Sequence, residues 1–169
     1  METNLKKYEL FSELECQSII SDVNKDDKVW YKTFRPTVLT TSLNENLWYS
    51  KKITNWISEH FNLNESKLKL GFDGTCFKYF PNSFFHEHTD VLNHNKSYPL
   101  YNINVILNND FEGGNFFLNR IEYESIPGFI YKYKSNEKHG VKMVTSGIRY
   151  VLVYHVFDTD LKITQKNYI

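Results

Sequence analysis

From Lys67 onward the chain is a succession of short runs rich in β-branched and aromatic residues, and this pattern narrows the folds open to it. Turn signals such as Gly113-Gly114 and Pro127-Gly128 separate several of the runs. No helix-length segment alternates with them, which argues against βαβ units. Eight runs within about ninety residues favour a β-sandwich or a jelly-roll barrel. The expected strands are 67–72, 75–80, 84–90, 100–108, 115–118, 128–133, 140–144 and 147–157.

The first 66 residues have a helical pattern instead. Ser12 followed by Glu15 is a capping box, which predicts a helix beginning there. A second helix is expected from about Asn46 to Phe61, because its large apolar residues recur at helical spacing. Residues 25–45, between the two helices, look irregular and polar.

The expected fold class is therefore α+β, mainly β, with N-terminal helices supporting a β-barrel. With 169 residues and no linker or repeat, the chain is expected to form a single domain. We divide it into helical support at 1–66, a jelly-roll core at 67–157 and a C-terminal tail at 158–169.

Composition excludes several classes of protein. Twenty Lys and Arg balance twenty Asp and Glu, so the chain lacks the basic face of a nucleic-acid-binding protein. No apolar run approaches the roughly 18 residues of a membrane-spanning helix, and the N-terminus has no signal-peptide core. Cys16 and Cys76 form neither a disulfide framework nor a CxxC metal site. These features predict a cytoplasmic protein without a nucleic-acid or membrane partner.

The densest group of metal-ligand residues lies at 84–90. On a strand, alternate residues share a face, so His86, His88 and Asp90 would point the same way. His88 and Asp90 then supply two ligands of a 2-His-1-carboxylate triad, which leaves coordination positions open on iron(II). The alternative is a solvated polar strand end. A cupin-type site is disfavoured, because no Glu follows His88 at four or five residues.

The C-terminal third supplies a further histidine and an arginine. His139 begins an apolar run, and Arg149 opens a strongly β-prone strand. An arginine facing the core would need an anion, and its planar fork suits a carboxylate. With the opposite parity the side chain would be outward and solvated, and the strand pattern alone leaves both orientations open.

These residues, in this order, resemble those of the Fe(II)/2-oxoglutarate-dependent oxygenases, in particular the prolyl 4-hydroxylase-like branch. The resemblance covers roughly 10–157 and rests on five ordered motifs. They are the helix-opening segment from Phe11, the stretch from Phe77 to Asp90 with its HTD, Asn104-Val-Ile-Leu-Asn108 with the following FEGG, His139, and Val144-Thr-Ser-Gly-Ile-Arg-Tyr150.

The resemblance implies a double-stranded β-helix (jelly roll) and a set of residue roles. His88, Asp90 and His139 would bind Fe(II), while Arg149 would bind the distal carboxylate of the cosubstrate 2-oxoglutarate. Tyr79 would offer its hydroxyl to the same molecule. O2 would be the second cosubstrate and ascorbate a candidate auxiliary reductant. The reaction implied is hydroxylation with release of succinate and CO2.

Some positions depart from the family pattern. Ile106 stands where related hydroxylases often have a Tyr, and His155 stands where a Trp is common. Asn102 and Asn104, on the same strand face as Ile106, are candidates to compensate, or are surface amides. His155 would face the pocket with Arg149, as a ligand or as a hydrogen-bonded core histidine. His86 is either in the surroundings of the metal site or solvated.

The resemblance predicts a peptide or protein substrate, most simply prolyl 4-hydroxylation. A lysyl hydroxylase, a hydroxylase of free amino acids or other small molecules, and a non-catalytic jelly-roll binding module are the alternatives. A second Arg six residues after Arg149, common in the nucleic-acid demethylases, is absent from the sequence. Segments 25–45 and 91–99 are the expected substrate-covering elements. The sequence does not specify the oligomeric state.

Overall fold

The protein is described by a computed structural model over residues 5–25, 28–33, 38–61, 68–90 and 99–158, except for the side chains at 68–73 and 158. Two helices and a larger set of antiparallel strands make up these ranges, which confirms the mainly β prediction. Their bounds are β1 Lys6–Glu9, α1 Glu13–Val23, β2 Tyr31–Lys32, β3 Val38–Ser42, α2 Trp48–His60, β4 Leu68–Tyr79, β5 Phe85–His88, β6 Tyr101–Ile106, β7 Glu112–Gly113, β8 Phe116–Leu118, β9 Ile121–Tyr123, β10 Phe129–Lys134, β11 His139–Val141, β12 Val144–Ser146 and β13 Arg149–Asp158.

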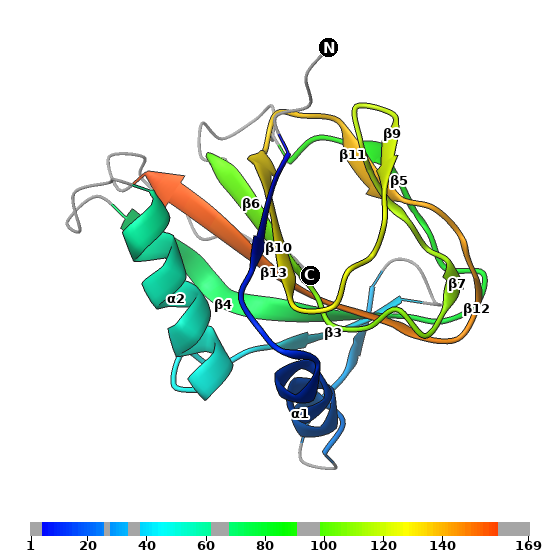
Figure 1. Ribbon diagram of the computed structural model, residues 1–169, viewed down its shortest axis with the longest axis horizontal. Coiled ribbons are helices and arrows are strands. Elements are labelled where there is room, and N and C mark those ends of the chain that lie inside the picture. The colour runs from blue at the N-terminus through cyan, green and yellow to red at the C-terminus, as the bar shows by residue number, and fades with distance from the viewer. Residues whose placement is uncertain (1–4, 26–27, 34–37, 62–67, 91–98, 159–169) are drawn as a thin grey trace.

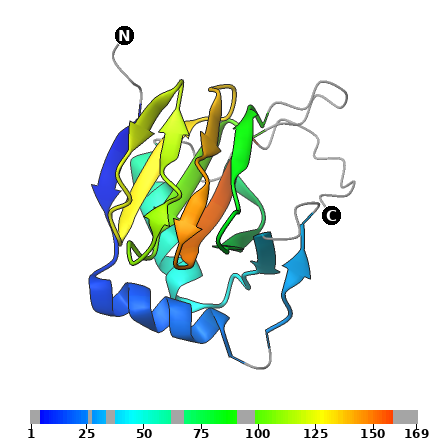
Figure 2. The same ribbon diagram turned by 90° about the vertical axis from the view of Figure 1, so that its right-hand side faces the viewer.

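Two sheets face each other and form a jelly roll. The larger sheet has the strand order β1-β10-β6-β13-β4-β3-β2, and the smaller one has the order β5-β11-β8-β9. Figure 1 shows the two sheets on opposite sides of the barrel, and Figure 2 views the smaller sheet face on. A short pair, β12-β7, forms a separate two-stranded sheet.

Both helices lie against the outer face of the larger sheet (Figure 1). The predicted capping box is present, since the Ser12 hydroxyl accepts from the Glu15 amide and the Glu15 carboxylate accepts from the Ser12 amide. Helix α2 buries Ile53, Trp56 and Ile57 and so packs as its apolar stripe predicts.

Alternation along β13 divides the apolar residues into two cores. Tyr150, Leu152, Tyr154 and Val156 face the helices and join the first core. Val151, on the opposite face, packs with residues of the smaller sheet inside the barrel. The interior of the jelly roll is therefore the second core, and this is the side from which the candidate site is built.

One predicted turn is not a turn. Residues 68–79 form the single strand β4, whereas the sequence predicted two strands, 67–72 and 75–80, with a turn between them. Gly74 lies within the strand, and a Cβ there would overlap the ring of Tyr154. The glycine therefore allows this ring to pack closely against the strand. The pairing of β4 with β13 also shifts register between Val153 and His155, which is typical of a β-bulge.

The N-terminal 66 residues are also less helical than predicted. Strand β1 pairs with β10, and β3 pairs with β4, so both belong to the larger sheet. Segment 25–45 was expected to be irregular, but 38–42 is a strand. The expected covering loop 91–99 lies outside the described residues except for Pro99, as does the tail beyond 158. None of the helices in the described ranges combines the length and the apolarity that crossing a bilayer requires.

Candidate metal and cosubstrate site

Two histidines far apart in the sequence are cross-strand partners in the smaller sheet. His88 ends β5 and lies directly opposite His139, the first residue of β11. Paired residues of an antiparallel sheet place their side chains on the same face. The centroids of the two rings accordingly lie 4.2 Å apart. His139 is buried and His88 is half-buried.

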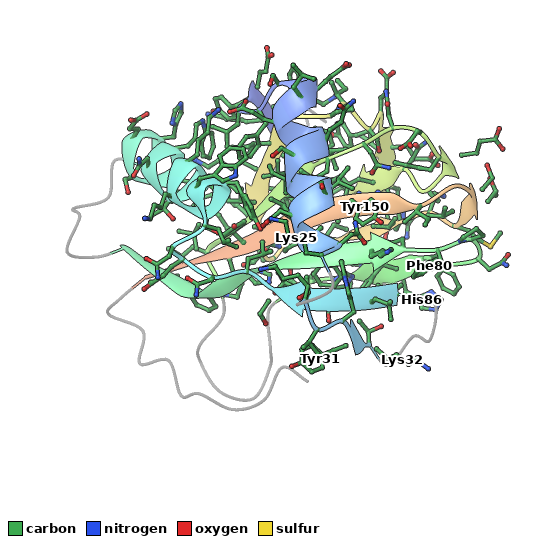
Figure 3. All side chains as sticks on the ribbon, turned by 90° about the horizontal axis from the view of Figure 1, so that it is seen from below. Lys25, Tyr31, Lys32, Phe80, His86 and Tyr150 are labelled. Carbon is green, nitrogen blue, oxygen red and sulfur yellow. The ribbon has the colours of Figure 1, made fainter. Side chains whose placement is uncertain are left out.

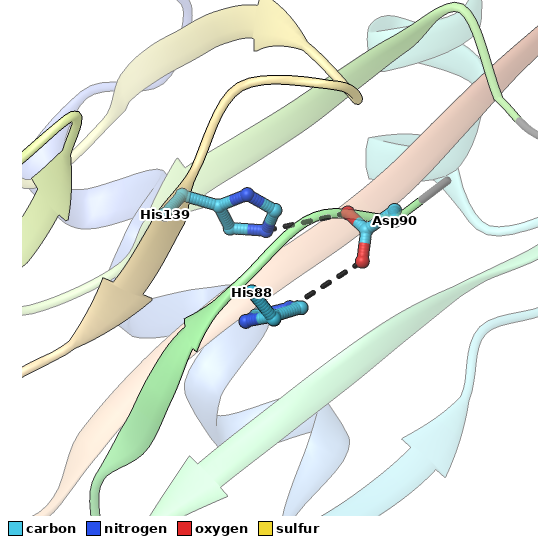
Figure 4. A group of neighbouring side chains, drawn as sticks. All are labelled: His88, Asp90 and His139. Atoms are coloured by element: carbon cyan, nitrogen blue, oxygen red, sulfur yellow. Dashed lines mark ion pairs between the residues drawn. The ribbon is translucent and has the colours of Figure 1, made fainter. Parts of the chain in front are cut away.

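Asp90 completes this group from the turn that follows β5. Its backbone amide donates to the Ser135 carbonyl at 2.9 Å, which holds the turn in place. Its carboxylate lies 3.4 Å from Nε2 of His88 and 3.3 Å from Nε2 of His139 (Figure 4). The three side chains offer ligand atoms that all lie within 4.8 Å of one another. We refer to His88, Asp90 and His139 as the triad.

The hydrogen bonds of the two imidazoles determine which nitrogen faces the carboxylate. His88 Nδ1 lies 2.8 Å from the His86 carbonyl, and His139 Nδ1 lies 2.9 Å from the Glu137 carbonyl. A carbonyl only accepts, so each Nδ1 carries a proton. Nε2 is therefore the nitrogen that faces the carboxylate in both residues. It donates to Asp90 while the imidazole is protonated, and in the neutral tautomer it offers a lone pair to a cation.

The charge on Asp90 fits this arrangement. Burial alone raises the pKa of its carboxyl, but contacts with His139 and His88 outweigh burial and hold the pKa well below its usual range. Asp90 is therefore ionised at neutral pH. Two imidazole nitrogens and one carboxylate are the donor set that suits iron(II) with open coordination positions.

His86 does not join the triad, although strand alternation predicted that it would share a face with His88. One extra residue in β5 between the pairs Val141–Phe85 and His139–His88 forms a β-bulge. The bulge brings Phe85 beside His88, with ring centroids 4.7 Å apart. His86 is exposed and lies at the periphery of the molecule (Figure 3).

Arg149 adopts the inward orientation. It is fully buried at the start of β13, directly opposite Tyr79 of β4. Gly147, with φ +74°, makes the preceding turn, where a Cβ would lie 2.6 Å from the Asp110 carbonyl oxygen. None of the three guanidinium nitrogens has a hydrogen-bond partner among the described residues. Burying a cation of this kind is costly unless an anion offsets the lost hydration.

Three tyrosines surround Arg149, and sequence reasoning had assigned a role to one of them. The guanidinium carbon lies 5.1 Å from the ring centre of Tyr79. Burial lowers the pKa of Arg149, and the hydroxyls of Tyr79, Tyr131 and Tyr133 oppose that shift. Tyr133 also has its ring centroid 4.8 Å from that of His139, so it is close to the triad as well as to Arg149. The alternation in Phe129–Lys134 could have revealed that Tyr131 and Tyr133 share a face.

The remaining candidate residues line the same inner face. Ile106 is buried in the barrel core and offers no polar atom. Asn104 is buried as well, and its Nδ2 donates to the Tyr133 hydroxyl at 3.2 Å. Asn102 is buried next to Asp90, to which it donates at 2.5 Å. Asn102 and Asn104 are therefore interior amides, and His155 is hydrogen-bonded to Asn102.

No family model matches the sequence, and no curated protein matches it. The fold, by contrast, has many solved relatives. A prolyl hydroxylase from Trichoplax adhaerens, in complex with a hypoxia inducible factor peptide fragment, has a TM-score of 0.73 at 13% identity, covering 95% of this chain and 87% of that one. The viral collagen prolyl hydroxylase of Paramecium bursaria Chlorella virus-1, in a 2-oxoglutarate complex, has a TM-score of 0.70 at 15% sequence identity. The match covers 92% of this chain and 96% of that one.

A third relative has a different ligand. HygX from Streptomyces hygroscopicus, with nickel, 2-oxoglutarate and hygromycin B bound, has a TM-score of 0.68 at 12% identity, covering 93% of this chain and 84% of that one. The chain thus has the jelly-roll fold of the 2-oxoglutarate and Fe(II) oxygenases, prolyl hydroxylases among them. At these identities the likeness describes the fold, and function has to be argued from the site.

Proposed function

We propose that this protein is an iron(II)- and 2-oxoglutarate-dependent dioxygenase that hydroxylates a peptidyl residue, with proline as the first substrate to test. One observation carries the proposal. The same jelly roll brings together a triad of ligand atoms within 4.8 Å and a fully buried arginine with unpartnered nitrogens among the described residues. A metal ion would account for the triad, and a carboxylate of a small molecule bound to that metal would account for the buried arginine.

The residues present fit the implied groups. Two imidazoles with protonated Nδ1 atoms have Nε2 available for the metal, and the ionised Asp90 supplies the balancing negative charge. Three protein ligands leave room for a bidentate oxo acid and for O2. Oxoglutarate carries a second carboxylate at its far end, and the Arg149 fork is suited to bind it.

Each residue then has a defined task. His88, Asp90 and His139 would hold the metal, Arg149 would bind the distal carboxylate, and Tyr79 would offer its hydroxyl to oxoglutarate. Bound iron(II), with oxoglutarate and O2, supplies the oxidising chemistry that yields succinate and CO2 and adds one oxygen atom to a C–H bond. Ascorbate would serve as an auxiliary reductant.

The solved relatives support a peptide substrate, because one of the similar prolyl hydroxylases is in complex with a peptide fragment. Hydroxylation of a small molecule is a second candidate, favoured by the similarity to HygX with hygromycin B bound. Lysine in a peptide is the third candidate substrate. Residues 26–27, 34–37 and 91–98, within the segments expected to cover the substrate, lie outside the described residues.

The test is turnover by the purified protein with iron(II), ascorbate and oxoglutarate. Succinate should form, and proline peptides, lysine peptides and small molecules, including free amino acids, should be screened for a mass gain of one oxygen atom. His88→Ala and His139→Ala should abolish both products. His60→Ala is the matched control, because His60 is exposed on α2 and makes its hydrogen bond to the Trp56 carbonyl.

Persistent succinate formation in both triad variants would overturn the assignment of the metal ligands. A metal complex without an oxoglutarate-dependent visible absorption band, and without succinate, would favour the non-catalytic binding module. A mass gain on lysine peptides alone would replace proline as the substrate while leaving the reaction class intact.

A further inference from the structure

A chain of hydrogen bonds approaches the triad from the larger sheet. Asn102 on β6 donates its Nδ2–H to Asp90 Oδ2 at 2.5 Å. The other end of this amide, Oδ1, lies 2.8 Å from Nδ1 of His155 on β13. Asn102 and His155 are direct cross-strand partners, so the sheet register itself places them face to face.

The proton positions along this chain follow from chemistry. The amide atom that faces Asp90 is Nδ2, which donates to the carboxylate oxygen. Oδ1 of Asn102 is then the atom facing His155, and since an amide oxygen only accepts, His155 Nδ1 carries a proton. Every bond therefore points toward Asp90, and donation by His155 to the amide oxygen strengthens donation by the amide nitrogen.

The location of these polar groups is costly for a purely structural role. Asn102 is fully buried, and Val151 and Val153 share the inner face of β13 with His155. Apolar side chains would fill this row without the desolvation that a buried amide and imidazole require. The polar pair stands where its amide reaches a candidate metal ligand, Asp90.

We infer that His155 and Asn102 are positioning residues that orient the Asp90 carboxylate for metal binding, His155 acting through Asn102. The inference rests on the proposed metal site. It adds two residues of the larger sheet that hold the ligand Asp90. Partners of this kind fix the rotamer of a ligand before the metal arrives, so the binding free energy is not spent on ordering it.

The test measures metal affinity, using Mn(II) as a redox-inert probe in titration calorimetry. His155→Phe keeps a ring of similar shape and removes the donor, and should weaken Mn(II) binding by about 10-fold or more. His155→Asn returns an N–H near the position of Nδ1 and should restore most of the loss. The control is His60→Leu, which removes an imidazole remote from the triad in sequence and should leave Mn(II) affinity unchanged.

A double-mutant cycle tests the order of action. Asn102→Leu should weaken Mn(II) binding at least as much as His155→Phe, and the double variant should be no weaker than Asn102→Leu alone, because His155 acts through the amide. Thermal unfolding without metal separates loss of affinity from loss of the fold. If His155→Phe does not fold, His155→Leu, which also lacks the donor, takes its place in the comparison.

Two outcomes have different meanings. If the wild-type protein binds no Mn(II) or Fe(II), the proposed function fails and this inference fails with it. If the wild-type protein binds the metal and folded His155→Phe binds it equally well, the metal site stands and only the positioning role is overturned. Additive losses in the double variant would likewise overturn the claim that His155 acts through Asn102.

Discussion

Replacing Arg149 by Met should change stability and ligand binding in opposite directions. Arg149 is fully buried, and its three nitrogens lack hydrogen-bond partners among the described residues. Arginine stays charged in proteins, so the free protein bears the cost of burying this cation. Met is similar in length and carries no charge. Removing a poorly compensated buried charge in this way is worth about 1–4 kcal/mol.

The loss of binding is estimated from the lost attraction between the guanidinium and the carboxylate of oxoglutarate. Two opposite unit charges about 4 Å apart, at an effective dielectric constant of about 20, attract by about 4 kcal/mol. Since each 1.4 kcal/mol is about tenfold in affinity, Arg149→Met should weaken oxoglutarate binding about 1,000-fold. Arg149→Lys keeps the charge but lacks the planar fork, so its affinity for oxoglutarate should lie between those of the wild type and Arg149→Met.

The assay is thermal unfolding with Mn(II), with and without oxoglutarate. For a domain of this size each kcal/mol moves Tm by about 2–4 °C. Without oxoglutarate, Arg149→Met should melt higher than the wild type. Oxoglutarate at about 100 times its Kd should stabilise the wild type by about 2.7 kcal/mol and leave the variant unchanged. A variant that melts lower when free, and is stabilised by oxoglutarate as much as the wild type, would refute the assignment of Arg149 as the anion site.

Three further substitutions and one labelling experiment have definite expected outcomes. Tyr133→Phe removes a buried hydroxyl close to the triad and to Arg149 and should weaken oxoglutarate binding by about 1 kcal/mol in a Mn(II)-loaded titration; unchanged affinity would remove Tyr133 from the pocket. Ser12→Ala deletes the capping box and should cost about 1 kcal/mol in urea unfolding. Gly147→Ala should cost more than Ser12→Ala, because φ is +74° and the Asp110 carbonyl oxygen blocks the new Cβ. Burial raises the pKa of the Cys16 thiol to about 11, so alkylation at pH 8, followed by mass spectrometry, should be slow in the folded protein and rise with pH; rapid labelling would contradict its burial.

Much of the fold could be predicted because its signals are local. The capping box at Ser12 and the apolar stripe of the second helix identified α1 and α2, and β-rich runs identified most strands of the barrel core. The errors arose where a local signal had a tertiary cause. Gly74 resembled a turn residue but accommodates the ring of Tyr154, and β1 and β3 are strands because a partner strand lies beside them.

The candidate site shows the same division. Residue types and strand alternation paired His88 with Asp90, and the resemblance to the 2-oxoglutarate oxygenases added His139 and Arg149 to the candidate residues. The pairing of His88 with His139, by contrast, is a contact between strands about fifty residues apart. Alternation along β5 even misplaced His86, because the bulge that turns it outward is visible only once β11 is in register.

What the amino-acid order determined, then, was the inventory of donors and the alternation that assigns each to one face of a strand. The tertiary structure decided which faces meet. It placed Tyr131 and Tyr133 near Arg149, and it placed Asn102 between His155 and Asp90. The physical reason is that strand periodicity is a property of neighbouring residues. Register is a property of the whole sheet, and is fixed only when both cores are packed.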